Sequence, residues 1–121
     1  MPDMLVYRIE HRETGIGPYH SSQKQPGLRQ WNKEYDTMPP PRIDGLSKVK
    51  HYHRFAHPDL IVIQTHYRKR IIKWLDKKGY LLAVYKIHKD YRVGNSGKQV
   101  VFNIKHAEKV KTIPLLEVIN D

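Results

Sequence analysis

Positive charge on a predicted helix is the feature of this sequence best suited to binding chemistry. The stretch THYRKRIIKWLDKKG, residues 65–79, carries six lysines and arginines and a single acid. Ammonium and guanidinium groups form strong charge-assisted hydrogen bonds with phosphates and carboxylates, so this run indicates a polyanionic partner. The predicted contact residues are His66, Arg68, Lys69, Arg70, Lys73 and Lys77, together with Arg92 and Lys98 from neighbouring basic loops.

The overall charge supports the same interpretation. The net charge is +10, and residues 42–98 hold 14 lysines and arginines against four acids, while the segments on either side are balanced. A localised excess favours nucleic acid or an acidic protein surface as the partner. The alternative is a basic surface that has no partner and only keeps the protein solvated.

Other chemistries have weaker support. The stretch HYHRFAH places three histidines close together, but no further ligand stands at a familiar spacing, so we predict a basic loop and no metal site. The stretch GNSGK lacks the spacing of a phosphate-binding loop and leads into a strand, which indicates a hairpin tip. The sequence has no cysteine, and this excludes disulfides, thiol nucleophiles and zinc ribbons.

A helix must position these cations. Tyr67, Ile71, Trp74 and Leu75 recur on one side at helical spacing, and the cations lie on the other side. Thr65 can cap the start, or the helix can begin near Asp59. Gly79 occupies the place of a terminating glycine. The sequence therefore predicts one amphipathic helix with Trp74 and Leu75 in the core.

Strands and a long loop account for the rest of the chain. Residues 4–11 and 80–87 read as strands, and residues 80–104 as a hairpin. Residues 109–118 read as a last strand, placed at a sheet edge by Pro114. Residues 20–58, which include three consecutive prolines, read as an irregular excursion with one short helix at 27–35.

These elements predict an α+β fold with a small, mostly antiparallel sheet, one main amphipathic helix and a long irregular loop. The length fits a single domain over residues 1–121. No stretch is apolar enough for a signal peptide or a membrane span, so we expect a cytoplasmic protein without membrane contact. The sequence leaves the oligomeric state open.

Two stretches resemble a group of small phage and prophage proteins. They are VYRIEHRETGIGPYHSS near the start and GYLLAVYKI with GKQVVF near the end. The resemblance implies a phage or mobile-element protein that works in the cytoplasm of a host cell. It also implies inhibition of a host system that handles nucleic acid or provides defence.

The same outline distantly resembles the ADP-ribosyltransferase fold, which would make the protein an NAD-dependent enzyme or its inactive relic. By that resemblance Arg8 or His11 would hold NAD, and Tyr19 would stack on it. Gln99 stands where the family has its catalytic glutamate, and glutamine supplies no negative charge.

Two further observations bear on that resemblance. The next two acids after Gln99 in the sequence are Glu108 and Glu117, and neither fits the family's pattern. Arg8 has a simpler alternative role, which is to pair with Glu10 or Glu13. We therefore expect a binding protein without a cofactor, with NAD chemistry as the alternative.

Overall fold

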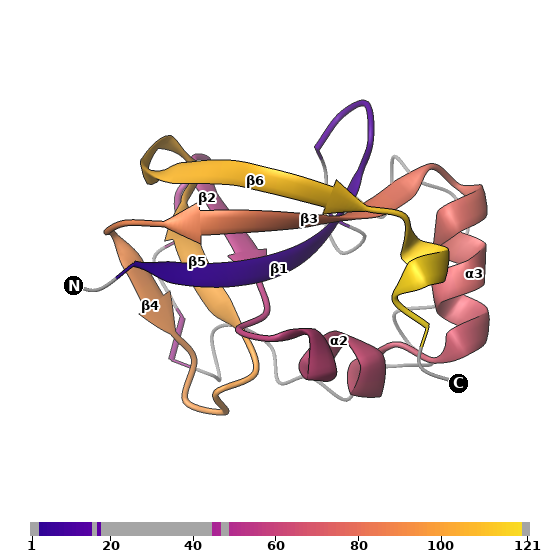
Figure 1. Cartoon of the computed structure of the whole chain (residues 1–121). Coiled ribbons are helices and arrows are strands. Elements are labelled where there is room, and N and C mark those ends of the chain that lie inside the picture. The colour runs from indigo at the N-terminus through magenta and orange to yellow at the C-terminus, as the bar shows by residue number, and fades with distance from the viewer. Residues whose placement is uncertain (1–2, 16, 18–44, 47–48, 120–121) are drawn as a thin grey trace.

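Two three-stranded antiparallel sheets form the frame of the protein (Figure 1). The computed structural model describes residues 3–15, 17, 45–46 and 49–119. The long sheet has the order β1 (Met4–His11), β3 (Tyr80–Ile87) and β6 (Ala107–Ile113). The short sheet has the order β2 (His53–Ala56), β5 (Val100–Asn103) and β4 (Tyr91–Val93). The helices are α2 (Leu60–His66) and α3 (Lys69–Lys77), with 3-10 turns η1 (Ile104–His106) and η2 (Leu115–Glu117).

This arrangement confirms the predicted α+β class, with two small sheets in place of one. In the described ranges, no helix is long and apolar enough to cross a membrane. The predicted helix at 27–35, and the loop around it, lie outside the described residues. The last part of the predicted irregular segment forms strand β2, which the sequence pattern did not indicate.

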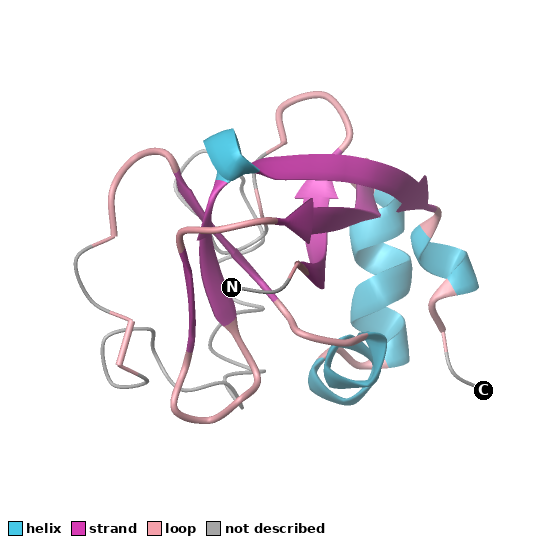
Figure 2. Ribbon diagram, turned by 60° about the vertical axis from the view of Figure 1, so that its left-hand side comes forward, coloured by secondary structure: helices cyan, strands magenta, loops and turns pink. Residues whose placement is uncertain are grey.

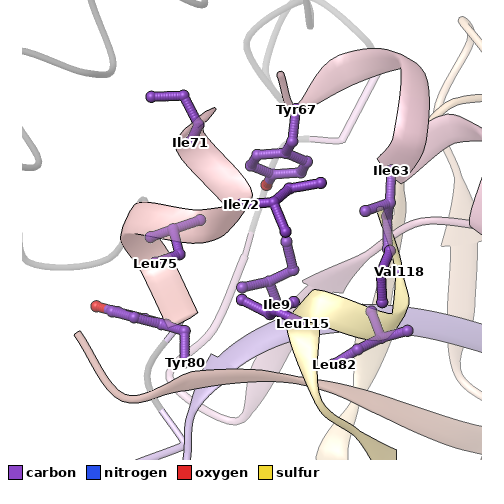
Figure 3. Packing of buried hydrophobic residues seen from close by; sticks show 10 residues of the cluster. All are labelled: Ile9, Ile63, Tyr67, Ile71, Ile72, Leu75, Tyr80, Leu82, Leu115 and Val118. Carbon is purple, nitrogen blue, oxygen red and sulfur yellow. The ribbon is translucent and has the colours of Figure 1, made fainter. Parts of the chain in front are cut away.

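The long sheet separates two apolar cores. Ile9 of β1 pairs with Leu82 of β3, and both belong to the core beneath the helices, which Figure 3 shows. Val6 pairs with Tyr85 on the opposite face, where both pack with Phe102 of the short sheet. Because side chains alternate along a strand, β1 and β3 each supply residues to both cores. The predicted strands 4–11 and 80–87 are confirmed.

The predicted helix 65–79 is two short helices instead. Asp59 caps α2 by accepting a 3.0 Å hydrogen bond from the backbone N–H of Val62, so Thr65 is not the cap. The backbone is extended at Tyr67 and Arg68, and α3 then begins at Lys69. Tyr67 is only 3% exposed, because the break lets the chain change direction and bury this ring in the core under both helices.

The sequence predicted the end of α3 at Gly79 and the packing of its apolar side in the core, and the structure agrees with both. Gly79 follows the helix with φ of +95°, a backbone conformation that glycine adopts without strain. Ile71 and Leu75 are buried, and Leu75 is fully so. Trp74 is half-buried at the margin of that core, and the Lys78 ammonium lies 5.9 Å from its ring centroid.

The predicted hairpin over 80–104 is wrong in its first strand. Strand β5 pairs with β4, and the segment 80–87 belongs to the long sheet as β3. The chain leaves the long sheet at Asp90, which has φ of +59° and accepts a 2.8 Å hydrogen bond from the side-chain amide of Asn103. This turn directs the chain into the short sheet, so the hairpin is formed by β4 and β5 alone.

Strand β6 lies at the edge of the long sheet, as predicted from Pro114. It ends at Ile113, and residues 115–117 form η2 where the sequence predicted more strand. The register shifts between Val84 and Tyr85, and exposed Lys109 and Lys111 lie on either side of the irregularity. Lysines and bulges on an edge strand discourage pairing with other chains.

Candidate anion-binding surface

Five cations of the predicted site are exposed on α3 and at its N-cap. We call them the α3 basic face: Arg68, Lys69, Arg70, Lys73 and Lys77. The opposite side of the helix holds Ile71, Ile72 and Leu75 in the core. The buried side therefore fixes the orientation of α3 and turns its cations to solvent.

The N-terminal end of α3 carries an unusual concentration of positive charge. Arg68 is the N-cap and makes no side-chain capping bond, Lys69 and Arg70 follow, and the first turn contains no acid. Cations at this end interact unfavourably with the helix dipole, and the like charges of Lys69, Lys73 and Lys77 at i,i+4 spacing add further repulsion. A bound anion would interact favourably with these exposed cations.

The other three predicted contact residues do not join this surface. His66 is 7% exposed in α2, with its ring centroid 4.6 Å from that of Tyr67. It is an interior residue, and its assignment to the cationic helix face was wrong because the helix breaks directly after it. Arg92 and Lys98 are exposed in the β4–β5 hairpin, and Figure 1 shows β4 at the opposite end of the molecule from α3.

A buried arginine connects β1 with its surroundings. Arg8 is 8% exposed, and its Nε lies 3.2 Å from Oε1 of Glu10. Its Nη1 donates to the carbonyl of Phe55 at 2.8 Å, and its Nη2 to the carbonyl of Gly15 at 3.0 Å. Burial lowers the pKa of Arg8, and the Glu10 carboxylate opposes that shift. Arg8 thus joins the first strand to the following turn and to the short sheet.

Glu10 is the centre of this network, a role that the sequence did not indicate. It is 2% exposed and accepts from the Tyr85 hydroxyl at 2.8 Å and from the Lys109 ammonium at 2.6 Å. Burial and the bond to Glu10 raise the pKa of Tyr85, and the bond to Glu10 raises the pKa of Lys109. Three donors therefore satisfy the carboxylate, which indicates a structural ion cluster. No sequence pattern brings residues so distant in the chain together.

The comparisons with known proteins place the chain in a phage family. A protein-family model described as Bacteriophage T4 Y00F protein matches residues 4–116, from the first residue of β1 into η2. The chain belongs to this family. The match confirms the resemblance to small phage proteins. Neither the search of curated proteins nor that of solved structures found a match.

The comparisons give no support to the resemblance to ADP-ribosyltransferases. Arg8 is occupied by Glu10 and two carbonyls, which confirms the alternative pairing with Glu10. His11 lies at the end of β1, where its Nδ1 accepts from the backbone N–H of Glu13 at 3.2 Å. Gln99 is 6% exposed beside β5, and Tyr19 lies outside the described residues.

The three clustered histidines have different surroundings. Nδ1 of His53 accepts a 2.8 Å hydrogen bond from the backbone N–H of Lys50, and His51 is exposed. Nδ1 of His57 lies 2.9 Å from the carbonyl of Lys98, and because a carbonyl only accepts, this nitrogen carries the proton. Burial lowers the pKa of His57. Among the described residues, no three histidine or acidic side chains gather as a metal site.

Proposed function

We propose that this phage-family protein binds a polyanion through the α3 basic face. The partner is nucleic acid, or an acidic surface of a host protein that handles nucleic acid or provides defence, met in the host cytoplasm. The observation that carries the proposal is the exposure of four cations on one side of a helix whose other side is fixed in the core, with a fifth, Arg68, exposed at its N-cap. The protein acts by binding, and its described residues supply no reactive group to this face.

The dimensions of the face suit a chain of phosphates. From Lys69 to Lys77 the helix rises about 12 Å at 1.5 Å per residue, which covers a few phosphate groups. Each phosphate contact releases condensed counterions, so the affinity for nucleic acid should fall steeply as salt rises. An acidic protein surface would give a shallower dependence on salt.

The test compares two triple variants that remove the same charge. The first carries Lys69→Gln, Arg70→Gln and Lys73→Gln on the α3 basic face. The matched control carries Arg12→Gln, Lys89→Gln and Lys111→Gln, which are exposed residues outside α3. Both should melt close to the wild type, since substitutions at exposed positions have small effects on stability.

Binding is measured with labelled nucleic acid across a range of salt concentrations, and by capture of partners from host lysate with and without nuclease. The α3 variant should reduce the slope of log affinity against log salt by about 2 to 3, at roughly 0.9 for each phosphate that the variant no longer neutralises. A partner retained after nuclease treatment but not captured by the α3 variant would be an acidic protein. Equal binding by both variants to every partner found would refute the proposal.

A further inference from the structure

A second group of aromatic and basic side chains lies where the turn before β2 meets η1. We call it the Tyr52 cluster: His51, Tyr52, His53 and Lys105. The ring centroid of Tyr52 lies 5.3 Å from that of His51 and 4.6 Å from that of His53. The Lys105 ammonium lies 5.2 Å from the same centroid, within the range of a cation–π contact. His51 and Lys105 are exposed, and Tyr52 is half-buried.

Backbone hydrogen bonds hold this turn in a defined shape. His53 donates its N–H to the Lys50 carbonyl at 3.0 Å and accepts from the Lys50 N–H at Nδ1. The carbonyl of Tyr52 accepts a 3.0 Å hydrogen bond from the N–H of Ile104. Nη1 of Arg54 donates to the carbonyls on both sides of Tyr52, at 2.8 and 2.9 Å. A ring presented on such a frame loses little conformational freedom when a ligand binds.

The cluster is separate from the α3 basic face. Tyr52 is bonded to Ile104 at the start of η1, and Figure 2 shows η1, just before β6, well away from α3. The two surfaces can therefore be tested independently, and binding at the Tyr52 cluster does not depend on the function proposed for α3.

The composition of the cluster selects among polyanions. An acidic protein or a nucleic-acid duplex offers charge to the cations, but neither offers an exposed planar base to the tyrosine. A single strand offers both, because its unpaired bases stack on aromatic rings while cations neutralise its backbone. We infer that the Tyr52 cluster is a binding surface for single-stranded nucleic acid.

The binding step follows from the contact between Lys105 and Tyr52. A base replaces the ammonium over the face of the Tyr52 ring, and the displaced ammonium pairs with a neighbouring phosphate. The exposed imidazole of His51 can donate a further hydrogen bond to that phosphate. No covalent bond changes in this step.

The experiment uses a fluorescent 12-nucleotide single strand and the matching duplex, with binding measured by anisotropy at low salt. Tyr52→Leu removes the aromatic face but keeps an apolar side chain, and Tyr52→Phe is the matched control. We expect Tyr52→Leu to weaken single-strand binding roughly 10- to 100-fold, which is typical for the loss of one aromatic side chain that stacks on a base. Tyr52→Phe should bind like the wild type. Lys105→Gln should lower the salt slope by about 1.

A second measurement uses the wild-type protein, so that the result does not depend on a variant that folds. The ring-proton resonances of Tyr52 should shift upfield in NMR spectra as the single strand is added, because a stacked base shields them. No shift, or single-strand binding unaffected by Tyr52→Leu, would overturn the inference. So would a duplex, or a polyglutamate chain, that binds with equal affinity and with the same dependence on Tyr52.

The α3 triple variant separates this inference from the proposed function. If binding to the single strand is abolished in that variant and kept in Tyr52→Leu, the α3 proposal stands and this inference fails. If Tyr52→Leu alone weakens binding, this inference stands without the α3 proposal.

Discussion

Replacement of Arg8 by methionine tests the buried ion cluster. The change keeps an unbranched apolar stem and removes the guanidinium, so the Glu10 carboxylate stays buried with one donor fewer. Loss of one partner of a buried ion pair costs about 3–5 kcal/mol, because the remaining charge stays out of water. The carbonyls of Phe55 and Gly15 also lose a donor. We therefore expect the free energy of unfolding to fall by about 3–5 kcal/mol, a large share of the total of a typical domain.

The assay is urea denaturation followed by circular dichroism, with ΔG extrapolated to water. Arg12→Met is the matched control, because Arg12 is exposed and its Nε makes a long 3.4 Å contact to the Gly79 carbonyl. The same chemical change there should cost no more than about 0.5 kcal/mol.

A double variant tests whether the loss of stability comes from the Glu10 carboxylate, which stays buried without its arginine partner. Addition of Glu10→Met to Arg8→Met removes both buried charges. It leaves the uncharged Tyr85 hydroxyl without this acceptor, and it leaves Lys109, whose side chain is 44% exposed and can be hydrated. The double variant should then be more stable than Arg8→Met alone. An Arg8→Met protein within about 1 kcal/mol of the wild type would refute this reasoning, as would a double variant less stable than the single one.

Three further predictions concern the core, the pH dependence and the turns. Leu75→Ala should lower the free energy of unfolding, measured by urea denaturation, by about 2–5 kcal/mol, because Leu75 is fully buried. Trp74→Ala should lower it by less, because Trp74 is half-buried, and equal losses would contradict this placement. Burial lowers the pKa of His57, so at a given pH the unfolded chain binds a proton at this residue more readily than the folded protein does. The contribution of neutral His57 to stability is therefore complete above about pH 6.5, the pKa of an unperturbed histidine, and should decline as the pH falls below that value. Unfolding midpoints at pH 7.5 and 5.5 measure that decline, and His57→Gln should make it smaller; an unchanged decline would argue against this origin. Gly79→Ala and Gly97→Ala both place a side chain at a residue with positive φ, which costs about 1–2 kcal/mol of stability each. At Gly79 the new Cβ would also lie 2.8 Å from Nε2 of His11, whereas at Gly97 it would meet no atom within 4 Å. Gly79→Ala should therefore show the lower melting temperature, and the reverse order would contradict the structure.

The features of the fold that could be predicted are those encoded by neighbouring residues, such as the apolar run of a buried strand or the glycine at the end of a helix. The apolar run YLLAVYKI predicted β3 correctly because a strand buried on both faces needs apolar residues at nearly every position. Gly79 marked the end of α3 because a positive φ favours glycine. The break between α2 and α3 was not predicted, because Tyr67 lies at helical spacing from Ile71 and the pattern of apolar residues continues through the break.

Partners distant in the chain could not be predicted in this way. The segments 80–87 and 100–103 are close enough in sequence to form a hairpin, but they belong to different sheets, with the turn at Asp90 between them. The sequence suggested the pairing of Arg8 with Glu10 but not the burial of both, because charged residues seldom lie in a core and this burial depends on Lys109 and Tyr85 far along the chain. For the candidate site, helical spacing predicted the exposed cations of α3 correctly, but not the burial of His66.

The pairing of β1 with β3 also has a consequence for the synthesis of the protein. His11 pairs with Tyr80 and Met4 with Ile87, so the first strand finds its partner only after roughly 70 to 80 further residues have been made. At a synthesis rate of about 5–20 residues per second, β1 waits for several seconds with its backbone groups unpaired. The burial of Arg8 and Glu10 cannot occur in that interval either, because Tyr85 and Lys109, which enclose Glu10, come later in the chain. Both charged side chains therefore remain hydrated on the unpaired strand, and charges on an unpaired strand discourage its pairing with other chains. The charges enclosed in the finished protein thus protect the same strand while it is still alone.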